Sequence, residues 1–369
     1  MRITQLKTIA DIQTGPFGSQ LHKEDYVETG TPIVTVEHLG NRVFTEQNLP
    51  RVSDSDKARL IKYTLSTGDI VFSRVGSVDR CSYVDKSHDG WMFSGRCLRV
   101  RPTELVDSLY LYYYFCLEET KQFVRNIAVG ATMPSINTKL LGEVEIALPD
   151  LNNQKRIAAV LSSLDDKIEN NQKLNDNLQQ QAQAIYSSMF IDNPDPAWSH
   201  GHLSDLITVK YGKDHKKLAD GIYPVYGSGG IMRYVERPLY NKESVLIPRK
   251  GTLNNVMYVN QPFWSVDTMF YTEMKLPNVA KFVYHFVKAK DLASMNAGSA
   301  VPSMTTDILN AMEVVIPSAS ALEEFESLVA PMYEAMEAND VQSKALSQMR
   351  DTLLPKLMSG AIDVSDVQL

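Results

Sequence analysis

Apolar side chains recur at alternating three- and four-residue steps from residue 154 to residue 190. This spacing is an a/d heptad seam, which predicts one long helix whose apolar stripe needs a partner helix. Asn171 and Asn175 interrupt the seam. A polar residue at a seam position costs stability but fixes register, so we expect Asn171 to set the register of the helix pair.

A second seam lies 168 residues downstream in the same register, from residue 325 to residue 357, and it places Asn339 where the first seam has Asn171. The segment before each seam repeats as well. GATMPSINTKLLGEVEIALP (130–149) aligns without a gap on GSAVPSMTTDILNAMEVVIP (298–317). One offset that holds through both segments indicates a tandem duplication in which a helix ends each copy.

Short strand-like runs bounded by glycine turns fill the rest of each copy. DIVFSRVGSVDRCSYV (69–84) aligns without a gap on SVLIPRKGTLNNVMYV (244–259). In the first copy this run predicts strands at 69–74 and 81–84, and a helix follows at 106–122. Between the matched runs the copies differ in length and sequence, which suggests two domains of one fold that bind different things.

These patterns predict α/β (α+β) domains in tandem duplication, joined by two long helices that form an antiparallel coiled coil. Because each helix leaves its own domain at the C-terminal end, antiparallel pairing would give a pseudo-two-fold arrangement. The expected segments are a first domain at 1–149, a first helix at 150–195, a second domain at 196–317 and a second helix at 318–369.

Composition narrows the class of protein. The net charge is −7, but the acidic surplus lies on the two helical segments, and the two globular segments are nearly balanced. The overall sign therefore does not argue against a nucleic-acid partner. The three cysteines argue against a disulfide framework and a cysteine-rich zinc site. We expect a soluble, cytoplasmic chain without a membrane partner, because no apolar run approaches the roughly 18 residues of a membrane span.

Catalytic motifs are missing from the sequence. It contains neither a P-loop nor the Asn/Asp-Pro-Pro-aromatic loop of DNA amino-methyltransferases. His200 and His202 lie in a polar linker without neighbouring Cys or His residues, and this pattern does not favour a metal site. Glu-x-Lys triplets begin at Glu119 and Glu273 and resemble half of a nuclease site, but such triplets are common by chance. We therefore expect no catalytic residue, no metal and no cofactor in this chain.

The loops of both copies carry amides, hydroxyls and basic side chains. Arg and Lys suit phosphates and guanine, and amides and hydroxyls suit base edges. Taken alone, these loops also fit an ordinary solvated surface, but two related basic modules on a stiff bridge favour a split DNA site. The candidate DNA-binding residues are Lys23, Arg74, Arg80, Arg96, Arg125, Asn126, Thr132, Ser135, Asn137, Lys139, Lys210, Lys213, Lys216, Arg233, Arg249, Lys250, Asn254, Ser303 and Thr305.

Three strings resemble one known family: GPFGSQLHKEDYVETGTPIVTVEHL (15–39), ATMPSINTKLLGEVEIALPDLNNQKRIAAVLSSLDDKIENNQKL (131–174) and LLPKLMSGAIDV (353–364). Over essentially its whole length the chain resembles the specificity subunit of a type I restriction-modification system. The resemblance implies two target-recognition domains, each of which reads half of a bipartite double-stranded DNA site. It also implies helices that dock two methyltransferase (modification) subunits, with restriction (motor and nuclease) subunits joining through the complex.

The resemblance places S-adenosylmethionine, ATP and Mg²⁺ on those partners. The second copy departs from the first at Asp307-Ile308 and at the start of its helix, SASALEEFESL, so the two helices need not contact partners identically. As a stiff bridge, the helix pair would set the number of unread base pairs, and four residues inserted near Asn171 would lengthen that spacer or abolish binding.

Two other functions are compatible with parts of the pattern. A non-catalytic protein-binding scaffold would use the duplicated domains without reading a DNA sequence. A nuclease would use Glu273 and Lys275 and would cleave DNA with a metal ion.

Overall fold

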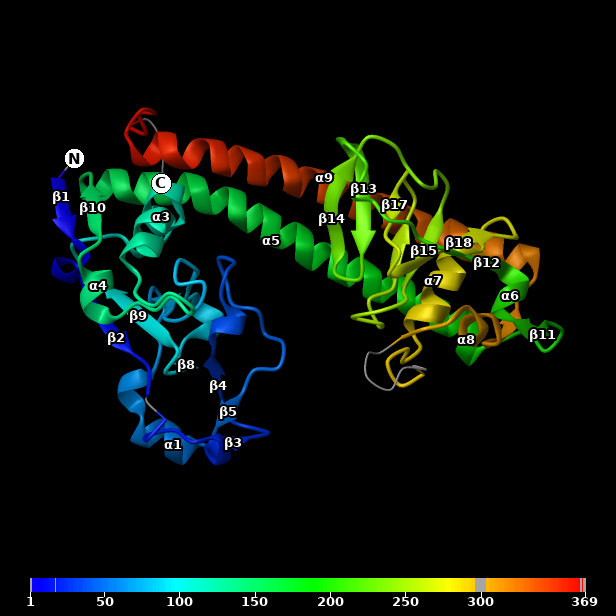
Figure 1. Cartoon of the computed structure of the whole chain (residues 1–369), viewed down its shortest axis with the longest axis horizontal. Helices are drawn as coiled ribbons and strands as arrows, with labels where there is room; N and C mark the ends of the chain where they lie inside the picture. The colour runs from blue at the N-terminus through cyan, green and yellow to red at the C-terminus, as the bar shows by residue number, and fades with distance from the viewer. Residues whose placement is uncertain (1, 17, 296–302, 366, 368–369) are drawn as a thin grey trace. The chain divides into compact units, whose positions relative to one another are not determined.

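The structure is a computed structural model that describes all residues except 1, 17, 296–302, 366 and 368–369. The chain divides into two compact units: unit 1 is Met1–Asn171 with Val341–Leu369, and unit 2 is Gln172–Asp340. Each unit holds one globular domain and one stretch of both long helices (Figure 1). The four-segment division expected from the sequence stays a prediction.

The first domain contains three small sheets. The central sheet has the order β2-β9-β6-β7, with β2 (Ala10–Thr14), β9 (Cys97–Pro102), β6 (Ile70–Ser73) and β7 (Cys81–Tyr83) all antiparallel. The second has the order β3-β5-β4-β8, with β3 (Tyr26–Val27), β5 (Arg51–Val52), β4 (Thr31–Val34) and β8 (Met92–Phe93), and its β4–β8 pair is parallel. The third pairs β1 (Arg2–Gln5) with β10 (Glu145–Leu148).

The helices of this domain are α1 (Asp54–Arg59), α2 (Ser108–Cys116), α3 (Glu118–Ile127) and α4 (Thr138–Gly142). The two predicted strands are present as β6 and β7. The single helix predicted at 106–122 is wrong, because the chain breaks into α2 and α3 at Leu117, whose ψ of 132° is not helical. The apolar α2 is buried on most sides, and the break redirects the more polar α3 towards the surface.

The second domain repeats this plan. Its central sheet has the order β12-β18-β15-β16, with β12 (Ile207–Tyr211), β18 (Met269–Met274), β15 (Ser244–Pro248) and β16 (Met257–Val259). The second sheet has the order β14-β13-β17, with β14 (Gly230–Val235), β13 (Asp220–Gly227) and β17 (Trp264–Ser265), and its β13–β17 pair is parallel. The third pairs β11 (Ser199–His202) with β19 (Glu313–Ile316), and the short helices are α6 (Leu203–Leu206), α7 (Ala280–Lys288) and α8 (Thr306–Asn310).

The matching order of the two central sheets, with one parallel pair in the second sheet of each domain, confirms the duplication of an α/β fold, although the second sheet has four strands in the first domain and three in the second. The two long helices are also present. They are α5 (Leu151–Ser187), extended by a turn of π-helix at Ser188–Asp192, and α9 (Ala319–Met358).

The long helices run antiparallel within each unit. In unit 1, the Asn171 side-chain amide donates to Gln342 Oε1 at 2.9 Å and to Ser343 Oγ at 3.1 Å. In unit 2, Asn339 donates to Asn175 Oδ1 at 2.8 Å. Within unit 1 the partner numbers in α9 fall as the numbers in α5 rise, from Asp165 with Arg350 to Asn171 with Ser343, which is the predicted antiparallel pairing. All three seam asparagines, Asn171, Asn175 and Asn339, bond across the helix pair.

Each domain packs against its stretch of the helix pair. In unit 1, Leu161 of α5 and Leu357 of α9 join the core of the first domain. In unit 2, Tyr186 of α5 and Phe325 of α9 join the core of the second. The helices are therefore part of both hydrophobic cores, and their apolar stripes are covered by the domains as well as by each other.

Buried polar groups join the helices to the domain in unit 1. Asp165 of α5 is 5% exposed and accepts hydrogen bonds from the Tyr113 hydroxyl at 2.7 Å and Arg350 Nη1 at 2.6 Å. Burial, with the nearby Asp165 charge, raises the pKa of Tyr113, so its hydroxyl remains a donor. The seam pattern did not reveal this network, because Asp165 falls outside the a/d positions.

Candidate nucleic-acid interface

One arginine organises the turn that follows β6 in the first domain. The Arg74 guanidinium donates from Nη1 to Gly95 O at 3.1 Å, and the Arg74 backbone N–H donates to Arg96 O at 2.8 Å. A third loop joins them, since Gly76 N–H donates to Pro134 O at 2.8 Å and Ile136 N–H donates to Arg74 O at 2.9 Å. Backbone hydrogen bonds therefore hold three loops together around Arg74.

Arg249 does the same after β15 in the second domain. Its Nη1 donates to Asp267 O at 3.1 Å, and its backbone N–H donates to Thr268 O at 2.9 Å. Met304 N–H donates to Arg249 O at 2.9 Å, and Lys250 forms a β-bridge with Ser303. The two arginines that align in the sequence thus have matching partners in space.

A fourth loop joins each group through a glycine. A Cβ atom on Gly15 would lie 2.1 Å from Ser94 O, and one on Gly212 would lie 2.0 Å from Val266 O, so neither position has room for a side chain. We call the loops around Gly15, Arg74, Gly95 and Ser135 loop cluster 1. The loops around Gly212, Arg249, Asp267 and Ser303 are loop cluster 2.

The two clusters share a backbone frame but differ in their side chains. Through the matching hydrogen bonds, Gly95 and Arg96 of cluster 1 correspond to Asp267 and Thr268 of cluster 2. A frame that holds loops rigidly and varies their side chains is suited to recognition rather than to one fixed chemical step.

A family model for the type I restriction modification DNA specificity domain matches residues 1–180 and 197–324. The chain belongs to this family. The two matches cover the two globular domains, so each copy of the duplication is one specificity domain.

Curated relatives and a solved structure are consistent with this family assignment. The MjaIX specificity subunit of Methanocaldococcus jannaschii is 27% identical over 72% of this chain and 72% of its own length. The HindI specificity subunit of Haemophilus influenzae is 21% identical over 82% of this chain and 88% of its own. The crystal structure of a type I restriction-modification S subunit from M. genitalium has the same fold, with a TM-score of 0.62, 19% identity, and 96% and 95% of the two chains covered.

Several candidate DNA-binding side chains of these specificity domains already bond within the protein. Their bonds stabilise local structure, so each would have to exchange a partner to contact DNA. The bonds are Arg125 to Asp79 and Glu118, Lys210 to Glu273, Arg233 to Asp220, Asn254 to Asp291, Gln122 to Asn126, Ser135 to Val129 O, and helix caps by Asn137 and Thr305.

Three of the remaining candidates are not fully exposed: Ser303 is half-buried, and Arg74 and Arg249 hold loops. The exposed candidates are Arg80, Arg96, Thr132, Lys139, Lys213, Lys216 and Lys250. Arg96 and Thr132 lie in cluster 1, and Lys213 and Lys250 lie in cluster 2. The Lys23 side chain, and residues 298–302 of the repeated loop, lie outside the described residues. Direct DNA contact by the candidates stays a prediction.

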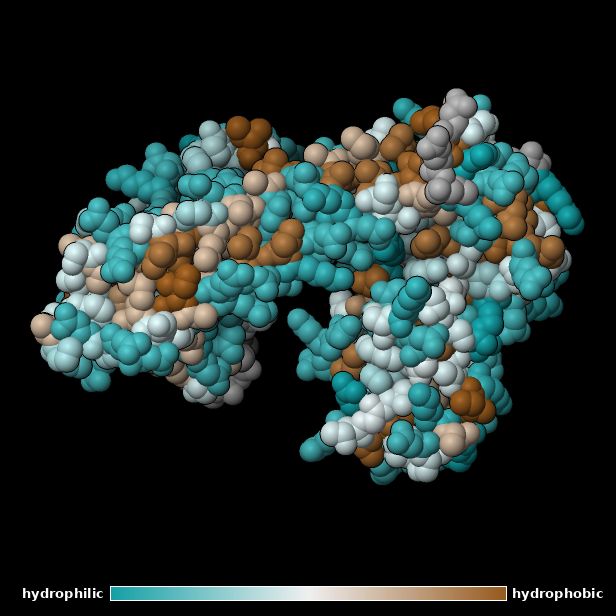
Figure 2. Space-filling view, turned by 180° about the vertical axis from the view of Figure 1, so that it is seen from behind, coloured by the Kyte–Doolittle hydropathy of each residue, from teal (hydrophilic) through white to brown (hydrophobic). Residues whose placement is uncertain are grey.

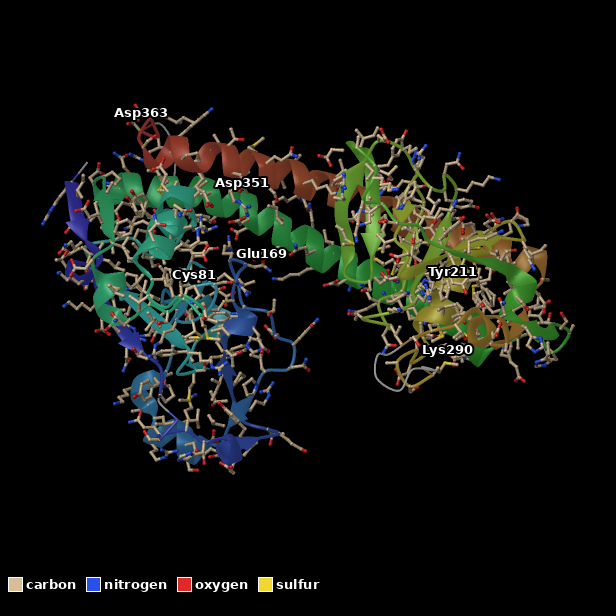
Figure 3. The ribbon with its side chains drawn as sticks, in the orientation of Figure 1. Cys81, Glu169, Tyr211, Lys290, Asp351 and Asp363 are labelled. Carbon is tan, nitrogen blue, oxygen red and sulfur yellow. The ribbon has the colours of Figure 1, made fainter. Side chains whose placement is uncertain are left out.

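Sequence reasoning missed Tyr211 (Figure 3). Tyr211 is 52% exposed, and the Arg249 guanidinium lies 5.4 Å from its ring centroid. Exposed aromatic–arginine pairs offer flat surfaces on which bases stack. The repeat could have revealed it, since Tyr211 precedes Gly212 as Thr14 precedes Gly15, and a bulky aromatic replaces a small residue there.

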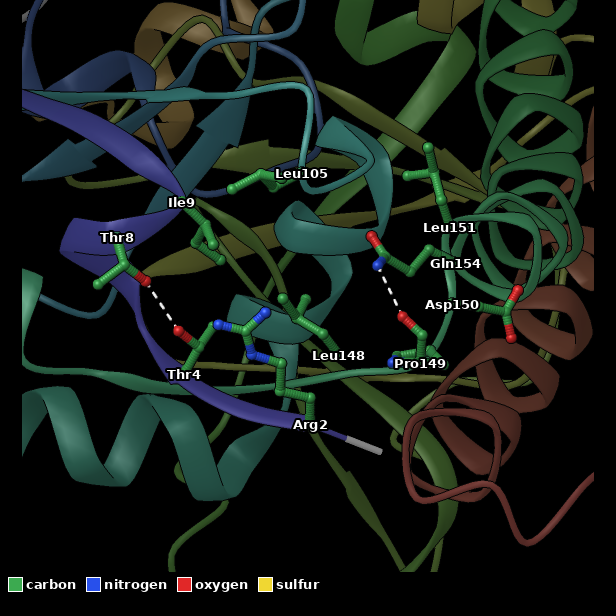
Figure 4. A pocket seen from close by; sticks show the side chains of 10 residues that line it. All are labelled: Arg2, Thr4, Thr8, Ile9, Leu105, Leu148, Pro149, Asp150, Leu151 and Gln154. Atoms are coloured by element: carbon green, nitrogen blue, oxygen red, sulfur yellow. Dashed lines mark hydrogen bonds between the residues drawn. The ribbon is translucent and has the colours of Figure 1, made fainter.

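A separate pocket of about 390 Å³ lies where β1, β10 and α5 meet in unit 1 (Figure 4). Its polar groups bond to each other: the Thr4 and Thr8 hydroxyls lie 2.8 Å apart, and Gln154 Nε2 donates to Pro149 O at 2.9 Å. It contains no residue of cluster 1. Gln154 Oε1 also accepts the Asp107 backbone N–H at 2.9 Å, which fastens the domain to the start of α5.

The described residues also bear on the expectations about cysteines, metal sites and membrane-spanning helices. Cys81, Cys97 and Cys116 are free thiols. Within the described ranges, no group of three or more His, Cys, Asp or Glu side chains is arranged to hold a metal ion. No helix in these ranges is long and apolar enough to cross a membrane.

Proposed function

We propose that this chain is the non-catalytic DNA-reading subunit of a type I restriction-modification complex. Each specificity domain reads one half of a bipartite target in double-stranded DNA through its own loop cluster. The observation that carries this proposal is the pair of clusters with one backbone frame and different side chains. Two readers with the same frame and different contacts suit a target whose halves differ in sequence.

The helix pair supplies the second part of the proposal. α5 and α9 dock two modification subunits and set the spacing between the half-sites, and restriction subunits join through that complex. S-adenosylmethionine, ATP and Mg²⁺ act on those partners, in the cytoplasm. The absence of a recognisable catalytic motif from the sequence supports this division of labour.

Methylation mapping tests the proposal directly. Cells that carry this gene with its type I modification subunit are compared with cells from which this gene alone is deleted. We expect methylated adenines in a split motif that disappear on deletion. An unchanged methylation pattern would contradict the proposed function and leave the protein-binding scaffold as the better explanation.

The salt dependence of DNA binding by single-residue variants distinguishes a DNA-reading subunit from a protein-binding scaffold. Arg74 and Arg249 are poor probes, because their replacement would loosen the turns that they hold. Lys250 is exposed in cluster 2, so Lys250→Ala should weaken binding and lower the salt slope by roughly one unit if Lys250 contacts a phosphate.

The matched control is Lys7→Ala, which removes a lysine that pairs with Glu143 at 2.9 Å outside the clusters. The salt slope of DNA binding by the Lys7→Ala variant should equal that of the unmodified chain. Equal slopes for the Lys250 variant and the control would contradict a phosphate contact at Lys250.

A further inference from the structure

Cluster 1 borders a pocket in which Arg96 is the one described lining residue that the sequence had already marked as a candidate for DNA binding. Its volume is about 590 Å³, and the turn at Ser94–Arg96 forms one wall. The segment Thr35–His38 and the chain around Asn48 form other walls. Buried Leu21 and His38 line it, and the His38 ring is fixed by bonds to Thr35 and to Gln47 O, so the base of the pocket is held rigidly.

Four side chains that line this pocket are exposed: Tyr26, Glu37, Asn48 and Arg96. Within the part of the chain that the structure describes, the side chains of Glu37, Asn48 and Arg96 form no hydrogen bond or ion pair. Their donors and acceptors are therefore available to a ligand at no cost to the bonds that hold the fold.

Neighbouring arginines of the same domain are used differently. Arg99 pairs with Asp11 at 2.8 Å, and Arg101 pairs with Asp69 at 2.7 Å. Arg96 lies on the turn just before β9 and is left out of these pairs. Arg99 and Arg101 therefore stabilise the fold, whereas the Arg96 guanidinium is available to bind a ligand.

The pocket side chains together match the edges of DNA bases. A guanidinium binds guanine O6 and N7, a carboxamide binds adenine N6 and N7, and a carboxylate accepts from the cytosine amino group. Tyr26, which is 38% exposed, adds an aromatic ring against which a base or a thymine methyl group can pack.

The face of the molecule in Figure 2 shows the lobe that carries β3 to β5 as largely hydrophilic or weakly polar, with only a few hydrophobic residues.

We propose that this pocket is the base-reading site of the first specificity domain, with Arg96, Asn48 and Glu37 as the residues that select the bases of one half-site. The inference rests on the proposed function and deepens it, because it assigns sequence selection to named side chains. Cluster 2 has Thr268 at the backbone position that matches Arg96, beside the Tyr211–Arg249 pair, so under this proposal the second half-site is read by different groups.

Methylation mapping with single variants of the full-length chain, expressed with its modification subunit, tests the assignment. The variants are Arg96→Ala, Glu37→Gln and Asn48→Asp. The last suits a position with a φ of 55°, where Asn and Asp are both tolerated. We expect each variant to relax the preference at one position of one half-site by roughly tenfold or more, and to leave the other half-site unchanged.

The control is Lys7→Ala, which removes an exposed basic side chain of the same domain that pairs with Glu143 at 2.9 Å away from the pocket. It should leave both half-sites as they are. The unchanged second half-site also reports that each variant folds and assembles.

Other outcomes overturn the inference. Variants that methylate the original motif at the original rate show that the pocket does not read bases. A fall in methylation with the preference at every position of both half-sites unchanged shows contact with phosphates alone. If the unmodified chain directs no methylation at all, the proposed function fails, and that result is distinct from an unchanged motif in working variants.

Discussion

At the scale of single residues, the structure contains one histidine whose neutral form is built into the core. His285 of α7 is fully buried. Gln183 Oε1 lies 2.8 Å from its Nδ1, and the Tyr333 hydroxyl lies 3.0 Å from its Nε2. Since Gln183 Oε1 can only accept, Nδ1 carries the hydrogen and Nε2 accepts from Tyr333. Burial, and secondarily the charge of Lys288, lowers the pKa of His285 to about 4.

This histidine predicts a pH dependence of stability. In the unfolded chain the imidazole titrates near pH 6.5, so between about pH 6.5 and pH 4 the unfolded state binds a proton that the folded state does not. The free energy of unfolding should therefore fall as pH is lowered through that window, by up to about 3 kcal/mol from this group. Urea unfolding of the chain and of His285→Gln at pH 7 and pH 5 measures it. The variant keeps a donor and an acceptor without the titration, so equal losses in the two proteins would contradict the assignment.

At the scale of elements, the buried carboxylate of Asp165 on α5 should stabilise the fold more than the exposed carboxylate of its neighbour Asp166. Asp165→Ala leaves the buried Tyr113 hydroxyl without its acceptor and removes the buried partner of Arg350, which keeps Asp351. Loss of such a buried acceptor costs about 1–3 kcal/mol. The matched control is Asp166→Ala, since the Asp166 side chain is 54% exposed and pairs with Arg42, and an exposed pair contributes about 1 kcal/mol or less. Urea unfolding of both variants measures the difference, and similar losses would show that Asp165 is not a key contact.

The sequence predicted the long elements better than the short ones. The heptad seam and the repeat have periods that survive divergence, so α5, α9 and the duplicated sheets could be read directly from them. The break at Leu117 was missed, because no glycine or proline marks it, and it separates the largely buried α2 from the more polar α3. The same limit applies to Asp165, whose partners come from α2 and α9.

The candidate site was predictable in outline only. Side-chain type and expected loop position selected Arg96 and Lys250, which are exposed. They also selected Arg125, which lies in α3 rather than in a loop and bonds to Asp79 and Glu118. Glu37 was overlooked because the search favoured basic and neutral groups. Which side chains are free to bind depends on their partners in space, and a single sequence does not carry that information.

At the scale of the whole molecule, the proposed function makes the helix pair a spacer that can be changed in length. The two helices face each other near Asn171 and Gln342 in unit 1, and near Asn175 and Asp340 in unit 2. One heptad inserted after Asn171 and another after Asp340 would keep both seams in phase. Seven helical residues add roughly 10 Å, which matches about three base pairs at 3.4 Å each.

The doubly extended chain should therefore methylate the same two half-sites with about three more base pairs between them, as read by methylation mapping. A heptad inserted into α5 alone is the control, because it moves the Asn171 bonds out of register with α9 and should lower stability and methylation together. If the double insertion keeps full activity on the original spacing, the helices do not set the distance between the half-sites. Retained half-sites with a longer spacer would show that reading belongs to the loop clusters and spacing to the helices, as two separable properties of one chain.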